Sequence, residues 1–97
     1  MSERFRYRGP AVIDGIQFTI VLLQEDTAPG ESLRSWSGTS SFNPSEAPEG
    51  FTGNLGASGP VKIELPEGRD GLVIVTEVGF DGQAWTVHLQ GTGPTPA

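Results

Sequence analysis

Residues 71–90 read GLVIVTEVGFDGQAWTVHLQ, two apolar runs joined by Asp81-Gly82. Both runs are rich in β-branched and aromatic residues, which favour the pleated conformation of a strand. Aspartate and glycine tolerate the positive φ angles of a tight type I′ turn, so an Asp-Gly pair between such runs predicts a β-hairpin. The same pair recurs at Asp14-Gly15 and Asp70-Gly71. The repeated signal predicts an all-β domain.

Alternation of apolar and polar residues, with turn signals roughly every 8–12 residues, predicts about seven short strands. Their expected ranges are 3–13, 16–24, 33–39, 51–55, 61–65, 71–78 and 83–90. The range 16–24 also fits helical spacing, but its β-branched and aromatic content favours a strand. Gly9-Pro10 marks a bulge or an edge position, because proline cannot donate to a ladder. The fold class is therefore all-β, a small antiparallel β-sandwich or β-barrel.

A period of two also predicts which side chains face the interior, because successive strand residues point to opposite sides of a sheet. The predicted core side chains are apolar and alternate along their strands. They are Phe5, Tyr7, Ile16, Phe18, Ile20, Leu22, Val61, Ile63, Leu65, Leu72, Ile74, Trp85, Val87 and Leu89.

Length and composition limit the class of protein. A chain of 97 residues makes one domain, which we place at residues 1–90, followed by a flexible C-terminal tail at 91–97. The absence of cysteine excludes disulfides, thiolate metal sites and a cysteine nucleophile. The N-terminus has no apolar segment typical of a signal peptide, and no run approaches the length of a membrane span. We expect a cytoplasmic protein, or one assembled into a larger particle, without a membrane partner.

Charge is distributed unevenly along the chain, whose formal net charge is −6. Arg4, Arg6 and Arg8 lie near the N-terminus with only Glu3 opposing them, whereas residues 9–97 contain 11 of the 12 acidic residues. An acidic surface repels phosphate backbones, which disfavours a nucleic-acid partner. Period two puts the three arginines on one strand face, and we expect this strand to lie at an edge and contact an acidic neighbour. The alternative interpretation is a solvated strand face.

No set of residues typical of catalysis or metal binding emerges. His88 is the only histidine, and alternation puts it on the solvated face of its strand. The serines of residues 35–41 form no nucleophile elbow, and Glu46 and Glu49 do not make a metal-ligand set. We therefore predict no catalytic residue, no cofactor and no metal site, and thus a protein that is not an enzyme.

Trp36 lies on the same predicted strand face as Arg34, next to the proline-containing segment 40–50. A tryptophan beside an arginine is typical of a binding hot spot. The predicted interaction site therefore consists of Arg4, Arg6, Arg8, Arg34 and Trp36. The alternative interpretation makes Trp36 and Trp85 the two large anchors of the core.

Several short motifs are spread over most of the chain. They are Tyr7-x-Gly9-Pro10-Ala11, Val21-Leu22-Leu23 in a hairpin strand, Trp36-x-Gly38, Val61-x-Ile63-x-Leu65-Pro66-x-Gly68 and Gly91-x-Gly93-Pro94. In these motifs the chain resembles an uncharacterised actinobacterial small β-domain, found alone or appended to flavin-dependent monooxygenase-like proteins. Residues 40–50 form an insert relative to the compact version of that domain. The resemblance implies an accessory, non-catalytic module and carries over no site residues.

Two functional hypotheses follow from these features. The first is a non-catalytic module that acts through protein–protein contacts as an accessory or assembly subunit, with a protein partner or with further copies of itself. One concrete form is a virion-surface or capsid-decorating protein. The alternative is an accessory domain associated with an oxidoreductase, which binds a small apolar ligand in a cavity lined by Phe18, Trp36, Phe42 and Trp85.

Overall fold

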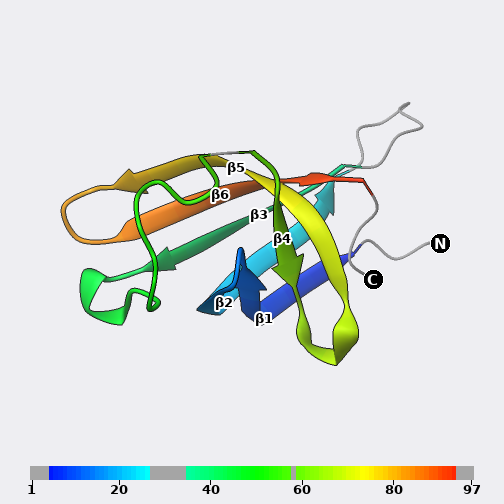
Figure 1. Ribbon diagram of the computed structural model, residues 1–97, viewed down its shortest axis with the longest axis horizontal. Coiled ribbons are helices and arrows are strands. Elements are labelled where there is room, and N and C mark those ends of the chain that lie inside the picture. Colours follow the sequence, from blue (N-terminus) through cyan, green and yellow to red (C-terminus); the bar gives the residue numbers. More distant parts are fainter. Residues whose placement is uncertain (1–4, 27–34, 58, 94–97) are drawn as a thin grey trace.

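The computed structural model describes residues 5–26, 35–57 and 59–93 and shows an all-β protein. The described part contains six antiparallel strands and two short 3₁₀ turns (Figure 1). The strands are β1 (Arg6–Ile13), β2 (Ile16–Asp26), β3 (Ser35–Phe42), β4 (Val61–Glu64), β5 (Asp70–Phe80) and β6 (Trp85–Thr92). The 3₁₀ turns are η1 (Pro44–Glu46) and η2 (Pro66–Gly68). The strand interpretation of residues 16–24 is confirmed.

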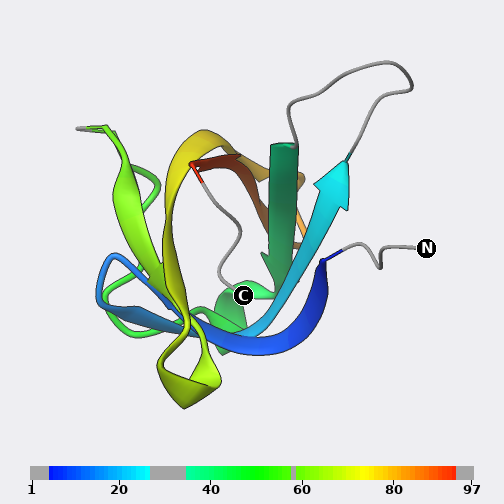
Figure 2. The same ribbon diagram turned by 90° about the vertical axis from the view of Figure 1, so that its right-hand side faces the viewer.

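The strands close into a barrel in the order β1-β2-β3-β6-β5-β4 (Figure 2). Two antiparallel meanders, β1-β2-β3 and β4-β5-β6, meet along β3–β6 on one side and β1–β4 on the other. The β3–β6 junction extends over six residue pairs, whereas the β1–β4 junction has two, Val12–Glu64 and Ile13–Ile63. The all-β prediction is confirmed, and of the two architectures left open by the sequence the structure is the barrel.

Two of the three Asp-Gly pairs form turns as predicted. Asp14 and Gly15 take φ angles of 53° and 79° between β1 and β2. At the β5–β6 turn, the Asp81 carboxylate accepts hydrogen bonds of 2.8 Å from the backbone N–H groups of Ala84 and Gln83. Because these bonds favour the ionised form, they lower the pKa of Asp81.

The prediction of a turn at Asp70-Gly71 is wrong, because both residues belong to β5 and pair with β4. The turn that precedes them uses Glu67 and Gly68, with φ angles of 70° and 78°. A hydrogen bond of 2.7 Å from the Leu65 N–H to the Arg69 carbonyl closes this turn. A Glu-Gly pair therefore provides the positive φ angles that the sequence pattern assigned to Asp-Gly.

The predicted strand at residues 51–55 is not a strand but part of the long connection from β3 to β4. The backbone turns here, with hydrogen bonds from the Phe51 N–H to the Pro48 carbonyl and from the Leu55 N–H to the Thr52 carbonyl. Leu55 is buried and Phe51 packs against the core. The apolar spacing that resembles a strand thus comes from a loop that covers the barrel.

Apolar side chains fill the barrel interior. The buried ones are Ala11, Ile13, Phe18, Val21, Leu23, Trp36, Leu55, Val61, Ile63, Leu65, Val73, Val87 and Leu89. The core prediction is confirmed by full burial of Phe18, Val61, Ile63, Leu65, Val87 and Leu89, and by partial burial of Phe5, Tyr7, Ile16 and Trp85. It is wrong for Ile20, Leu22, Leu72 and Ile74, whose exposed fractions are 39–51%.

A β-bulge explains the two errors in β2. Between Phe18 and Val21, β2 has two residues where β1 has only one between the corresponding partners. The extra residue reverses the side to which later side chains point. Phe18 and Val21 are therefore both buried, and Ile20 and Leu22 turn outward. The predicted irregularity at Gly9-Pro10 lies opposite this bulge.

The C-terminal boundary of the barrel lies beyond the predicted one. Gly91 and Thr92, assigned to the tail by the sequence, belong to β6. A Cβ atom added at Gly91 would lie 2.1 Å from the ring of Trp36, and the Trp36 Nε1–H donates to the Gly93 carbonyl at 3.1 Å. Residues 91–93 are thus tied to the barrel, and residues 94–97 of the predicted tail lie outside the described residues.

Candidate interaction surface

The arginines of β1 point away from the barrel core. Arg6 and Arg8 are exposed and alternate with side chains that are more buried. On the neighbouring strand β2, Leu22 lies opposite Arg8 and Gln24 lies opposite Arg6. The prediction that the arginines share one strand face is confirmed for these two, and Arg4 lies outside the described residues.

The prediction that the arginine strand is an edge strand is wrong, because β1 pairs with both β2 and β4 in the closed barrel. Among the described residues, the segment from Arg6 to Ala11 pairs with β2 alone, because β4 reaches only Val12 and Ile13. Pro10 lies in this segment and removes one backbone donor, a feature common on unpaired edges. Within the described residues, the arginines thus lie on a part of β1 that has one strand neighbour, and the guanidinium of Arg69 lies 5.5 Å from the ring centroid of Tyr7 between them.

Ile20 and Leu22 complete the same outer surface. Each is 46% exposed, although the sequence predicted both in the core. Leu22 lies between Arg8 of β1 and Thr39 of β3. Sequence reasoning missed these residues because the side chains that alternate with them are equally apolar, so only the bulge decides which ones face out. We refer to the group as the β2 face, which consists of Arg6, Arg8, Ile20 and Leu22.

The surface is hollowed on both sides of Leu22. A depression of about 380 Å³ lies between Leu22 and the arginines of β1. A second, of about 160 Å³, lies between Leu22 and the backbone of β3 at Gly38. Both are shallow surface features rather than enclosed sites. Shallow depressions of this kind suit contact with a protein partner better than binding of a small molecule, because proteins usually enclose small ligands in deeper pockets.

A second pair of exposed aliphatic side chains lies on β5. Leu72 is 51% and Ile74 is 39% exposed. The exposed carboxylates of Asp70 and Glu77 flank them on the same strand. Alternation could not predict which side chains of this strand face the core, because residues 72–75 are apolar on both faces. We refer to this group as the β5 face, which consists of Asp70, Leu72, Ile74 and Glu77.

Trp36 lies in the interior rather than at the surface. Its side chain is 1% exposed, and its ring packs edge-on against Phe5 with centroids 6.4 Å apart. The predicted role of Trp36 as a contact residue is therefore wrong, because its strand turns this side chain toward the core. The alternative interpretation, a large core anchor, describes Trp36 correctly. Its expected partner Arg34 lies outside the described residues.

The four side chains of the predicted ligand cavity do not line one space. Trp36 and Phe42 lie at opposite ends of β3. At the Phe42 end, aromatic rings pack on one another, and Phe51 contacts the rings of Phe18, Phe42 and Trp85 at centroid distances of 5.0–6.3 Å. This end of the barrel is filled by side chains.

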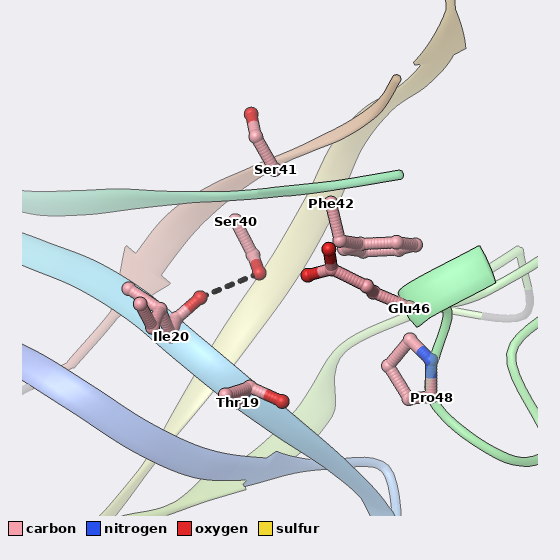
Figure 3. Close-up of a pocket in the computed structure, with 7 residues that line it drawn as sticks. All are labelled: Thr19, Ile20, Ser40, Ser41, Phe42, Glu46 and Pro48. Atoms are coloured by element: carbon pink, nitrogen blue, oxygen red, sulfur yellow. Dashed lines mark hydrogen bonds between the residues drawn. The ribbon is translucent and has the colours of Figure 1, made fainter. Parts of the chain in front are cut away.

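A small cavity of about 60 Å³ lies beside the β2 bulge, where β2 and β3 separate (Figure 3). The Ser40 hydroxyl donates to the Ile20 carbonyl at 2.7 Å inside it, and Glu46 extends toward Ser40 from η1. The volume is well below the roughly 300 Å³ of a typical ligand pocket.

His88 is exposed on the outer side of β6, as alternation predicted. It lies opposite Glu77 of β5, in an open depression of about 250 Å³. Within the described residues, no group of three or more histidine, aspartate or glutamate side chains is placed to hold a metal ion. That part of the chain also has no helix with the length and apolarity needed to cross a membrane.

Comparisons of the chain with protein-family models, with curated proteins and with solved structures gave no match. The resemblance to the actinobacterial β-domain therefore stays a prediction. The fold defines a small closed antiparallel β-barrel.

Proposed function

We propose that this protein is a non-catalytic β-barrel module that acts through protein–protein contacts, as an accessory or assembly subunit, and that the β2 face is its contact surface. The observation that carries the proposal is the 46% exposure of both Ile20 and Leu22, together with the position of Leu22 opposite Arg8. Contact surfaces typically combine apolar anchors with arginine, which is enriched there while lysine is depleted.

Burial of the β2 face against a partner is energetically favourable. Complete burial of a leucine or isoleucine side chain stabilises by roughly 1.5–3 kcal/mol, so finishing the burial of two half-exposed side chains contributes about 2 kcal/mol. Arg6 and Arg8 add charge-assisted hydrogen bonds to carboxylates, which determine orientation and association rate more than affinity. The expected partner surface has an apolar centre and acidic borders.

The remaining surface gives less support to catalysis than to contact. The single histidine, His88, is exposed on an outer strand. The cavity beside the bulge, of about 60 Å³, is too small to hold a substrate of ordinary size. A function through the outer surface of the barrel needs neither of these features.

The test uses the full chain as bait in an extract of cells that naturally express it. The wild type is compared with the variant Ile20→Ser/Leu22→Ser and with the control Phe80→Ser, which removes an apolar side chain of 48% exposure outside the β2 face. Any protein that the wild type retains is identified, purified and titrated by calorimetry.

We expect the wild type and the control to bind this protein equally, and the β2-face variant to bind at least about tenfold more weakly, equivalent to roughly 1.4 kcal/mol. Circular dichroism and melting temperature verify that all three chains fold. Equal binding by all three chains, or equal loss in the face variant and the control, contradicts the proposal.

A further inference from the structure

The β5 face is the chemical counterpart of the β2 face. Each presents two aliphatic side chains that are about half exposed. On the β2 face, Arg8 lies opposite Leu22, and Ile20 shares a small cavity with Glu46. On the β5 face, Asp70 and Glu77 flank the pair along the strand, and Lys62 of β4 lies opposite Leu72. One surface of the molecule thus offers the charges that the other surface would bind.

Among the strand side chains that the structure describes, the exposed charges differ between the two meanders, and Glu25 of β2 is buried. The exposed charged side chains described on strands β1–β3 are Arg6 and Arg8. Those described on strands β4–β6, His88 aside, are Lys62, Glu64, Asp70 and Glu77. The Lys62 Nζ lies 3.4 Å from a carboxylate oxygen of Glu64 and 3.5 Å from one of Asp70. One ammonium group thus pairs with two carboxylates, so the exposed strand residues of β4–β6 keep a net negative charge.

The distribution of charge on the two faces favours one way of packing two copies of the chain together. Two β2 faces packed together would offer the arginines no carboxylate of that face, and two β5 faces packed antiparallel would bring Asp70 and Glu77 of one copy against those of the other, which is repulsive. A β2 face packed on the β5 face of another copy brings opposite charges together around an aliphatic centre. Resting on the proposed function, we propose that the partner of the β2 face is the β5 face of a second copy.

The position of the two faces determines how such a contact continues. β2 and β5 are three strands apart in either direction around the barrel, and Figure 2 shows them on opposite sides of the molecule. A contact between unlike, opposite faces leaves one β2 face and one β5 face free at the ends of each pair. The association therefore continues to further copies and produces rings or filaments rather than a closed dimer.

Sedimentation velocity of the purified full chain over a wide concentration range tests this contact. One variant removes the β2 face (Ile20→Ser/Leu22→Ser), another removes the β5 face (Leu72→Ser/Ile74→Ser), and Phe80→Ser is the control. We expect the mass of the wild type and of the control to rise past the dimer with concentration, and each face variant alone to remain monomeric. An equimolar mixture of the two face variants should form a heterodimer and stop there, because it contains one intact copy of each face.

Charge reversal gives a second test that leaves all apolar side chains in place. Arg6→Glu/Arg8→Glu and Asp70→Lys/Glu77→Lys should each abolish association alone. Their equimolar mixture should associate past the dimer, because every β2 face then meets a β5 face of opposite charge. Raising the salt concentration should weaken this association and that of the wild type.

The outcomes separate this inference from the proposed function. A wild type that is monomeric at every concentration overturns the second copy as partner, and the proposed function survives if the bait experiment finds another protein that depends on the β2 face. Association that persists in either face variant alone also overturns the inference, because it reveals a contact between like faces or through another surface. If no partner, this chain included, depends on the β2 face, both proposals fail.

Discussion

Gly91 of β6 gives the ring of Trp36 the space that it occupies in the interior. A Cβ atom at this position would lie 2.1–2.4 Å from three atoms of the indole. The ring has little freedom to move away, because it is 1% exposed and its Nε1–H is bonded to the Gly93 carbonyl. Glycine is required here by close approach, not by an unusual φ angle.

We therefore predict that Gly91→Ala lowers the free energy of unfolding by roughly 1–3 kcal/mol, the usual cost of overpacking a core. Urea denaturation measures the change. The matched control is Gly79→Ala in β5, where the nearest atom to an added Cβ is 3.9 Å away and a change within about 0.5 kcal/mol is expected. Equal stability of the two variants would show that the indole does not pack against Gly91.

The bulge of β2 acts at the scale of the element, because it determines which residues of the strand face solvent. It also takes the Ile20 carbonyl out of regular pairing with β3, whose ladder with β2 begins at Leu22 and Thr39. The buried hydroxyl of Ser40 bonds to this carbonyl at 2.7 Å. A side chain of β3 therefore replaces the missing backbone partner.

Replacing Ser40 with alanine should destabilise the barrel by about 0.5–1.5 kcal/mol, the usual net contribution of one hydrogen bond, because the partly buried Ile20 carbonyl loses its protein partner. Thermal and urea unfolding measure this loss. Ser41→Ala serves as the control, since its hydroxyl bonds to Thr86 at 3.2 Å in an exposed position where water replaces it. The role of Ser40 in supporting the bulge is contradicted if both variants unfold like the wild type.

The chemistry of neighbouring residues predicted where turns and strands lie better than it predicted which side chains of a strand face solvent. The conformational freedom of Asp14-Gly15 and the hydrogen bonds of Asp81 act within a few residues, so the sequence identified both turns. The outward position of Arg6 and Arg8 followed from simple alternation. The exposure of Ile20 and Leu22, which completes the candidate site, depends on pairing with another strand. Alternation within one apolar strand contains no information about such a bulge.

At the scale of the whole molecule, the barrel is closed unequally. The junction of β1 with β4 has two residue pairs, while β5 and β6 pair along their length. Across the short junction, the Asp14 N–H donates to the Lys62 carbonyl at 2.9 Å. Few backbone bonds thus hold the first meander to β4, and local opening there requires less disruption than opening elsewhere.

Native-state hydrogen exchange followed by NMR should reveal this difference. We predict that the amide proton of Asp14 exchanges through an opening of lower free energy than the amide protons of β6 around Val87, which pairs with both β3 and β5. The amide protons of β5, which belongs to the same meander as β4, serve as an internal reference for exchange away from the β1–β4 junction. Protection of Asp14 equal to that of Val87 would mean that the barrel opens only as a whole.

The two tryptophans occupy different surroundings at the two ends of the barrel. Trp36 is enclosed beside Phe5, whereas Trp85 is partly exposed beside Phe80, with ring centroids 5.0 Å apart. Indole emission shifts to longer wavelength as water reaches the ring, so we expect the two fluorophores to have distinguishable spectra. The molecule therefore contains a built-in optical reporter for each end, and replacing one tryptophan with phenylalanine isolates the signal of the other.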